Sequence, residues 1–308
     1  MKHSLTFIPA ADSVQSTIQG DECLIFTHIP KAAGTTLDRL LKGVGSVKGL
    51  PWQRAFGTVY YQFLGKGKRE SRDDFLDWDE EKRASIRIIT GHVPFGIHEQ
   101  MPRKGRYVTL LRDPISRTVS HFKMGVGRGG WQAAEPLAEV MRKGGLTSDV
   151  QVRMLAGVLS PHDPVNEEIL KVALRNLEKH YFLVGFSDTF NQFTSALLGF
   201  LDGPNALLGE EQSGRVNISE TVEQQLRQDA EQYNQYDIMF YEAARGIAER
   251  KLAEFVLEHP EKSAGNRNTL LASSQIKLNK SQYSIISADQ LQPVMDKLVE
   301  KGVVIKGR

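Results

Sequence analysis

The stretch ECLIFTHIPKAAGTTLDRLL, residues 22–41, decides the fold of this chain. It begins with a short apolar run bounded by polar residues and a proline, which is typical of a buried strand. A glycine-containing turn follows, after which Leu37, Leu40 and Leu41 recur at helical spacing. The segment therefore predicts a strand, a loop and a helix in direct succession.

The same alternation continues along the chain. Further apolar runs predict strands at residues 85–92, 106–112 and 181–186. Helical patterns follow from residue 114, near 147–157, at 166–180, after 186, and over 219–258 as one or two long helices. Residues 43–80 are predicted to form loops with a short helix near 74–84. Strands alternating with helices predict an α/β fold with a mostly parallel sheet flanked by helices.

The length of 308 residues allows one large α/β domain or two modest ones. We expect an N-terminal extension over residues 1–20 and one main domain over residues 21–258. Residues 259–308 are expected to form a polar linker followed by a small strand–helix–strand extension.

Composition excludes several classes of protein. The formal net charge of +2 is too small for a nucleic-acid or membrane-surface binder, so any anion site must be local. No apolar run approaches the ~20 residues that span a bilayer, and the first residues do not resemble a signal peptide. These features predict a soluble, cytoplasmic protein. The single cysteine, Cys23, excludes an internal disulfide and is expected to be buried and inert.

The loop after the first strand has the components of an anion site. Backbone N–H groups at a helix N-terminus attract phosphate, and Gly34 permits close approach of the backbone. Thr35 and Thr36 add hydroxyl donors, while Lys31 adds a mobile charge. Because Lys31 precedes the glycine, the loop does not match the Walker pattern of ATP-binding proteins, and an ATP-dependent kinase is disfavoured. From the residues alone, a plain strand-to-helix turn remains the alternative.

The run HIPKAAGTT, residues 28–36, closely resembles the 5′-phosphosulfate loop of sulfotransferases. The form with HIPK and paired threonines resembles the carbohydrate-type branch, which includes heparan sulfate 2-O- and 6-O-sulfotransferases and bacterial relatives. This resemblance implies a P-loop-kinase-like sulfotransferase fold over residues 21–258. It also implies 3′-phosphoadenosine 5′-phosphosulfate (PAPS) as co-substrate and no metal. The cofactor-binding residues that it implies in this loop are Lys31, Ala32, Ala33, Gly34, Thr35 and Thr36.

A second segment, RDPISRTVSHF at residues 112–122, resembles the family motif that holds the 3′-phosphate of the nucleotide. Arg112, at the predicted strand end, can clamp a phosphate in bidentate fashion, and Ser120 can add a hydroxyl donor. Asp113 and Pro114 suit the cap and first position of a helix. A capped surface helix with ordinary arginines is the alternative, but it does not explain why the whole motif is present.

The transfer reaction also needs a base for the acceptor hydroxyl. His92 follows the second predicted strand in a "GH" context that is similar to the 2-O-sulfotransferase pattern, and we predict it to be this base. His98 is the substitute candidate. Thr90 occupies a position where that pattern has a second histidine, which leaves the acceptor arrangement open. Lys31 is predicted to neutralise the leaving oxygen.

The sequence therefore predicts an enzyme that moves the sulfuryl group of PAPS to a hydroxyl, with a glycan as the expected acceptor. A sulfotransferase for a lipid or other small alcohol is an alternative, because the segments 43–80 and 124–147, expected to contact the acceptor, diverge most freely. A nucleotide-binding module without transfer activity is the second alternative. Trp131 is a candidate sugar-stacking platform.

Overall fold

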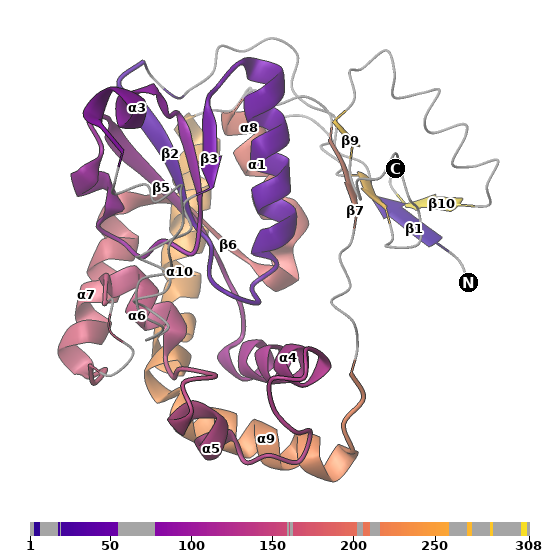
Figure 1. Ribbon diagram of the computed structural model, residues 1–308. Coiled ribbons are helices and arrows are strands. Elements are labelled where there is room, and N and C mark those ends of the chain that lie inside the picture. The colour runs from indigo at the N-terminus through magenta and orange to yellow at the C-terminus, as the bar shows by residue number, and fades with distance from the viewer. Residues whose placement is uncertain are drawn as a thin grey trace.

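The computed structural model describes the greater part of the chain (Figure 1). The described residues are 3–6, 18, 20–54, 78–158, 160, 163–201, 206–209, 216–258, 270–272, 284–285 and 303–306.

The main sheet has five strands, all parallel, in the order β3-β4-β2-β5-β6. Its strands are β2 (Glu22–Thr27), β3 (Trp52–Arg54), β4 (Ile88–Gly91), β5 (Lys104–Leu111) and β6 (Tyr181–Phe186). In the centre of the sheet, Thr27 pairs in register with Gly91 of β4 and Thr109 of β5. The predicted α/β fold with a mostly parallel sheet is confirmed, and the parallel order brings the carboxyl ends of the strands to one edge.

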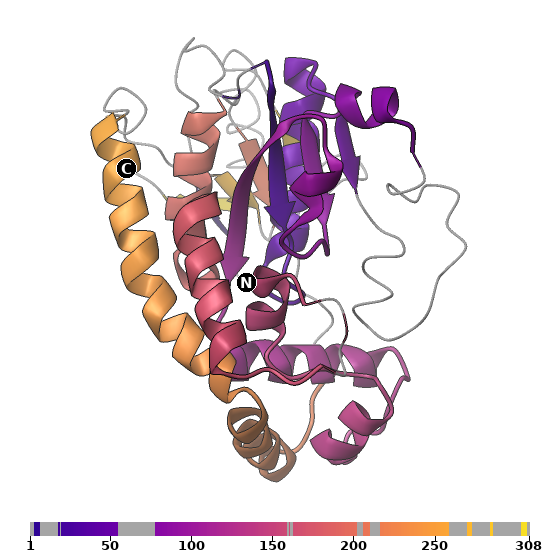
Figure 2. The same ribbon diagram turned by 90° about the vertical axis from the view of Figure 1, so that its left-hand side faces the viewer.

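Helices surround the sheet on both faces and also lie beyond its carboxyl edge (Figures 1 and 2). The helices are α1 (Gly34–Lys48), α3 (Glu80–Ser85), η2 (Ile97–Gln100), α4 (Pro114–Gly127), α5 (Leu137–Arg142), α6 (Val150–Ala156), α7 (Glu167–His180), η3 (Ser187–Thr189), α8 (Phe190–Phe200), α9 (Glu220–Tyr233) and α10 (Gln235–Glu258).

Alternate residues of β2 contribute to the two halves of the core. Leu24 and Phe26 point to the face covered by α1 and α8, while Cys23 and Ile25 point to the face covered by α6, α7 and α10. All four side chains are fully buried, as expected for a parallel strand covered on both faces. Burial raises the pKa of the Cys23 thiol to about 12, so the expectation of a buried, inert thiol is confirmed.

A third apolar cluster joins α4, α5 and α9 beyond the carboxyl edge of the sheet (Figure 2). Phe122 and Leu137 lie at its centre, and Lys123 of α4 forms an ion pair with Glu223 of α9 at 2.7 Å. Because only two residues separate the end of β5 from the start of α4, this cluster fixes α4 against the edge where ligands of parallel sheets usually bind.

The prediction that residues 43–80 form only loops and one short helix is wrong in part. Helix α1 continues to Lys48, because Val44 is buried against the sheet, and β3 adds an edge strand at residues 52–54. Three residues are too few to show a period, which is why β3 was not predicted. The short helix is present as α3, capped by Asp79, and residues 55–77 lie outside the described residues.

In the described part of the chain, five short strands form two small sheets apart from the main one. β1 (His3–Thr6) pairs in parallel with β10 (Val303–Lys306). β7 (Ala206–Gly209) pairs with β8 (Leu270–Ala272) and β9 (Ser284–Ile285). The helix predicted between β9 and β10 falls outside the described residues, and the proposed domain boundaries stay a prediction. Among the described helices, none is long and apolar enough to cross a membrane.

We expect Leu110→Ala to lower the free energy of unfolding by about 2–5 kcal/mol, because Leu110 is fully buried in β5 and its truncation leaves a cavity. Leu257→Ala is the matched control, since Leu257 is 80% exposed and should change stability by less than about 0.5 kcal/mol. Urea denaturation followed by circular dichroism measures both. Equal effects of the two substitutions would contradict the assignment of Leu110 to the core.

Candidate functional site

The loop between β2 and α1 is anchored by apolar residues and strained at two positions. Ile29 and Ala32 are fully buried in the core, and the Ala32 N–H donates to the Ile29 carbonyl at 3.3 Å. Lys31 lies between these two residues and has a positive φ of 69°. Ala33 follows Ala32 and has a positive φ of 62°. Each such residue costs about 1–3 kcal/mol and persists only where the surroundings hold it, which is common at functional sites. The anchored residues on either side supply that restraint.

Gly34 allows the loop to pass directly under the ring of His28. A Cβ atom at residue 34 would clash with the imidazole carbons and Nε2 of His28. The ring is stacked on Phe26 with centroids 5.4 Å apart and is 5% exposed. Glycine is therefore required here by close packing against a buried side chain.

The first turn of α1 presents backbone donors at the carboxyl edge. Ala33 at the N-cap provides no side-chain hydrogen bond, so the opening N–H groups of the helix are not capped by it. Thr35 and Thr36 lie in this turn and are half-buried. Unpaired N–H groups together with the helix dipole make a site suited to a phosphate or sulfate group.

Arg112 brings the second predicted segment into direct contact with this loop. Its Nη1 donates to the Lys31 carbonyl at 2.9 Å. The Asp113 carboxylate accepts from the Ser116 N–H at 2.8 Å, and Pro114 is the first residue of α4, as predicted. Burial lowers the pKa of the Arg112 guanidinium below its ordinary value. The two segments that the sequence predicted to converge therefore share one edge of the sheet.

One face of α4 is turned toward Lys31. The Lys31 ammonium lies 3.7 Å from the sulfur of Met124, three turns along the helix. Ser120 is four residues before Met124, on the same face, and is half-buried. Arg117 lies one turn before Ser120 and is fully buried. The structure thus places Ser120 on the side of α4 that faces the loop, between Arg112 and Met124.

His92 also lies at this edge, and its protonation state is defined by a backbone contact. Its Nδ1 is 2.6 Å from the His28 carbonyl, which can only accept, so Nδ1 carries the proton and Nε2 keeps its lone pair. The two rings are 4.4 Å apart. Burial lowers the pKa of His92 to about 4, with the charge of Arg54 adding to this effect. A neutral imidazole that carries its proton on Nδ1 can take up a second proton only at Nε2, which is the form that a general base needs.

His98 is placed elsewhere. Its Nδ1 is 2.9 Å from the Tyr107 hydroxyl, and its Cβ packs against Gly105 near the start of β5. Its ring also lies 5.9 Å from that of His180. The amino end of β5 is the opposite edge of the sheet from Arg112, so the geometry separates His98 from the other predicted residues.

Two polar residues beside the site, Arg54 and Asp38, were not predicted. Thr90 donates to the carboxylate of Asp38, which also forms an ion pair with Arg54 at the end of β3. Burial raises the pKa of Asp38, while these partners oppose the change. Thr90 stands where the family pattern has histidine, and its hydroxyl is engaged in the hydrogen bond to Asp38. Arg54 and Asp38 gave no recognisable sequence signal because they belong to a strand that was missed and to a helix interior.

His121 is a further residue that sequence reasoning missed. It lies on α4 between Arg117 and Met124, and its Nδ1 is buried without a hydrogen-bond partner in the described part of the chain. Burial lowers its pKa to about 3, and the charges of Arg117 and Lys31 contribute in the same direction. Its position inside the second motif is one that the motif leaves variable, so no signal marked it.

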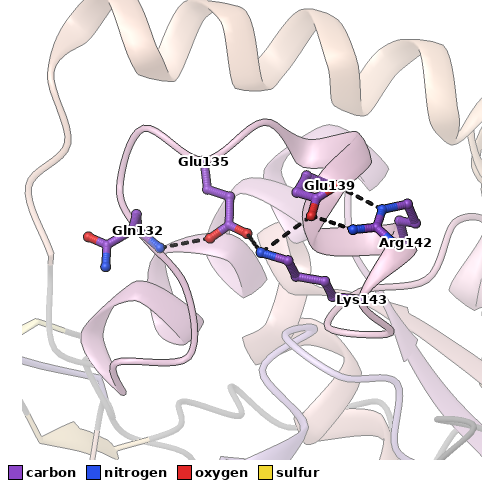
Figure 3. A network of polar contacts seen from close by, with 5 residues as sticks. All are labelled: Gln132, Glu135, Glu139, Arg142 and Lys143. Carbon is purple, nitrogen blue, oxygen red and sulfur yellow. Dashed lines mark hydrogen bonds and ion pairs between the residues drawn. The ribbon is translucent and has the colours of Figure 1, made fainter.

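Trp131 is partly buried and packs against the apolar cluster of α4, α5 and α9, and its sugar-stacking role stays a prediction. Its ring fills the space above Gly125, where any Cβ would clash, and its N–H donates to the Phe122 carbonyl at 3.0 Å. A surface network follows in the chain (Figure 3). Its hydrogen bonds and ion pairs join Gln132, Glu135, Glu139, Arg142 and Lys143. Exposed pairs of this kind stabilise little individually but hold the segment after Trp131 against α5.

The fold and site together define an α/β protein whose candidate anion site lies at the carboxyl edge of the sheet, between the loop after β2 and the junction of Arg112 with α4. No family model matches the chain. Curated relatives include heparan-sulfate 6-O-sulfotransferase 1 of Cricetulus griseus, which is 30% identical over 123 residues, covering 36% of this chain and 30% of the relative. Heparan-sulfate 6-O-sulfotransferase 3-B of Danio rerio is 30% identical over 118 residues, covering 36% and 28%. Heparan-sulfate 6-O-sulfotransferase 2 of Homo sapiens is 29% identical over 134 residues, covering 39% and 21%.

These relatives confirm the resemblance to carbohydrate sulfotransferases that the two motifs predicted. The matched region is less than a third of each relative's length. The relatives' names do not test the roles assigned to individual residues, and these roles remain predictions.

We expect Gly34→Ala to destabilise the protein by about 1–3 kcal/mol, because the added methyl must displace the His28 ring or the loop. Gly246→Ala is the matched control: nothing lies within 4 Å of a Cβ there, and alanine in the exposed middle of α10 should stabilise by up to about 1 kcal/mol. Thermal denaturation measures both. A Gly34→Ala protein as stable as wild type would contradict the packing of His28 on the loop.

We expect His92 to titrate near pH 4 rather than near its ordinary 6.5. Because the folded-state pKa is lowered, the unfolded chain binds more protons as pH falls from 6.5 to 4, so stability falls through that window. NMR of the imidazole protons gives the midpoint, and the signal is assigned by its loss in His92→Gln. The same substitution should flatten the pH dependence of stability between pH 6.5 and 4, whereas an unchanged slope would contradict the lowered pKa.

Proposed function

We propose that this protein is a sulfotransferase that moves the sulfuryl group of PAPS to an acceptor hydroxyl, with a carbohydrate as the acceptor. The observation that carries the proposal is the 2.9 Å hydrogen bond between Arg112 and the Lys31 carbonyl. It joins two segments, each of which resembles one nucleotide-binding motif of the family. A chance match of two unrelated stretches would not require them to touch.

The loop residues are proposed to hold the 5′-phosphosulfate. Lys31 supplies a mobile ammonium, and the opening N–H groups of α1, with the hydroxyls of Thr35 and Thr36, supply fixed donors. The positive φ values at Lys31 and Ala33 shape the backbone that leads into these donors. Such preorganised donors stabilise charge as it develops on the transferred group and on the leaving oxygen.

The second segment is proposed to hold the 3′-phosphate. One Nη of Arg112 is engaged with the loop, and the guanidinium carries further N–H donors that can bind phosphate oxygens. Ser120 lies on the loop-facing side of α4 and adds a hydroxyl. In this arrangement Arg112 contacts both the loop and the nucleotide. Binding of the 3′-phosphate would therefore affect the loop that holds the 5′-phosphosulfate.

In the proposed reaction the acceptor hydroxyl oxygen forms a bond to sulfur while the bond from sulfur to the 5′-phosphate oxygen breaks. His92 Nε2 takes the hydroxyl proton, and the Lys31 ammonium neutralises the charge left on the phosphate oxygen. The products are a sulfate ester and adenosine 3′,5′-bisphosphate. A positioned base of this kind contributes about 10²–10⁴-fold in rate.

A carbohydrate acceptor is supported by the names of the relatives, which act on heparan sulfate. The matches cover only part of each chain, so we do not infer from the relatives which sugar this protein would sulfate or at which position. Thr90 stands where the family pattern has a second histidine and bonds Asp38 instead, so this position departs from the pattern of the 2-O-sulfotransferases.

We expect adenosine 3′,5′-bisphosphate to raise the melting temperature of the protein, and the enzyme to turn over labelled PAPS with a suitable hydroxyl acceptor. Lys31→Ala should reduce turnover to background, because the leaving oxygen loses its cation. Lys171→Ala on α7 is the control, since Lys171 is exposed and pairs only with Glu168 in the described structure. Turnover is measured across a panel of sugar, lipid and small-alcohol acceptors.

The outcomes of this experiment separate the alternatives. Stabilisation without turnover on any acceptor would indicate a nucleotide-binding module. Turnover on alcohols or lipids but not sugars would contradict the acceptor class. No thermal shift at saturating nucleotide would overturn the proposed function as a whole.

We expect His92→Gln to lower kcat by about 10²–10⁴-fold while nucleotide affinity stays nearly unchanged, since the residue is proposed to act on the acceptor proton. His180→Gln is the control, because His180 is exposed at the end of α7. Single-turnover rates and calorimetric binding of adenosine 3′,5′-bisphosphate give the two quantities. An equal loss in both would count against His92 as the base.

A further inference from the structure

Gln151 makes an unusual pair of contacts with the main chain of Arg112. The Arg112 N–H donates to Gln151 Oε1 at 3.1 Å, and Gln151 Nε2 donates to the Arg112 carbonyl at 2.9 Å. Both bonds agree with one orientation of the amide, since turning it over would set donor against donor and acceptor against acceptor. The side chain is fully buried, so both bonds are shielded from water.

These contacts begin where the sheet ends. The register of β5 with β2 stops at Thr109, and its register with β6 stops at Leu111. Arg112 is the next residue, and the primary amide of Gln151 supplies one acceptor and one donor, as a peptide group of a neighbouring strand would. The main chain that carries the guanidinium is therefore held beyond the last strand pairing.

Gln151 is itself held by Asp237. One carboxylate oxygen of Asp237 accepts from the Gln151 N–H at 3.1 Å, and the other accepts from the Val152 N–H at 2.8 Å. In return, Asp149, which precedes α6, accepts from the Asp237 N–H at 2.9 Å. The first turns of α6 and α10 thus cap each other, and this buried arrangement fixes the residue that holds Arg112.

We propose that Gln151 is a positioning residue for nucleotide binding, which acts by fixing the main chain of Arg112 so that its guanidinium meets the 3′-phosphate. The inference rests on the proposed function, because Arg112 is assigned to that phosphate there. Asp237 contributes by holding Gln151 through its backbone N–H. Neither residue is expected to touch the nucleotide.

The test compares two nucleotides that differ only in the 3′-phosphate. Calorimetry measures the affinity of wild type and of Gln151→Met for adenosine 3′,5′-bisphosphate and for adenosine 5′-phosphate. Methionine keeps the length of the side chain and removes both hydrogen bonds. We expect the affinity for the bisphosphate to fall about 10- to 100-fold and that for the monophosphate to fall less than about twofold.

A double-mutant cycle with Arg112→Ala distinguishes positioning from general damage. If Gln151 acts through Arg112, then Gln151→Met should have almost no further effect on bisphosphate affinity in the Arg112→Ala background. Gln235→Met is the matched control, because Gln235 is exposed and bonds only to the Glu231 carbonyl in the described structure. Should Gln151→Met fail to fold, Gln151→Glu keeps an acceptor for the Arg112 N–H but turns a carboxylate oxygen toward the Arg112 carbonyl, and it should lower bisphosphate affinity at least as much.

The results separate this inference from the proposed function. If wild type binds both nucleotides equally, the assignment of the 3′-phosphate site fails. If wild type prefers the bisphosphate and Gln151→Met or Gln151→Glu keeps the full preference, the positioning role is overturned while the proposed function stands. Equal loss of both nucleotides in a folded variant would likewise overturn it.

Discussion

The hydrogen bond from Arg112 to the Lys31 carbonyl is the interaction on which the candidate site depends. Lys31 occupies a backbone conformation that side chains other than glycine adopt at a cost, and the arginine bonds the carbonyl of that same residue. The buried neighbours Ile29 and Ala32 prevent the loop from relaxing. The strain is therefore balanced locally, and the opening of α1 stays directed at the edge of the sheet.

The key side chains are set mainly through main-chain atoms. The His28 carbonyl defines the tautomer of His92, the Lys31 carbonyl receives Arg112, and Gln151 holds the peptide groups on either side of the Arg112 Cα. Fixing the backbone leaves the reactive ends of the side chains available for a ligand. It also links the loop to the base, because His28 packs on Gly34 with its ring and holds His92 with its carbonyl.

Much of the fold was predictable because its signals are local and periodic. The strands around residues 22–27, 88–91 and 181–186, and the capped start of α4, follow from apolar runs and cap residues that the sequence displays. β3 was missed because three edge residues carry no period. The convergence of Lys31 and Arg112 followed from the parallel order of strands, although the carbonyl contact between them did not.

Other parts of the site had no sequence signal. Gln151 and Asp237 meet because the first turns of α6 and α10 are in contact. Nothing in the sequence of a helix as short as α6 indicates which strand end its side chains reach. The role of Thr90 was open for a similar reason, since its partner Asp38 lies on α1, 52 residues earlier in the chain. Tertiary hydrogen bonds between distant buried polar residues are the least predictable element.

The lone sulfhydryl in the central strand has a practical consequence. Cys23 is fully buried and strongly resists ionisation, so a thiol reagent can modify it only when the sheet itself opens. Since the chain has one cysteine, the rate at which a thiol reagent modifies it would measure the opening of the core without a contribution from other thiols. If a bound nucleotide slowed the modification of Cys23, the change in rate would report how strongly the edge of the sheet is coupled to its centre.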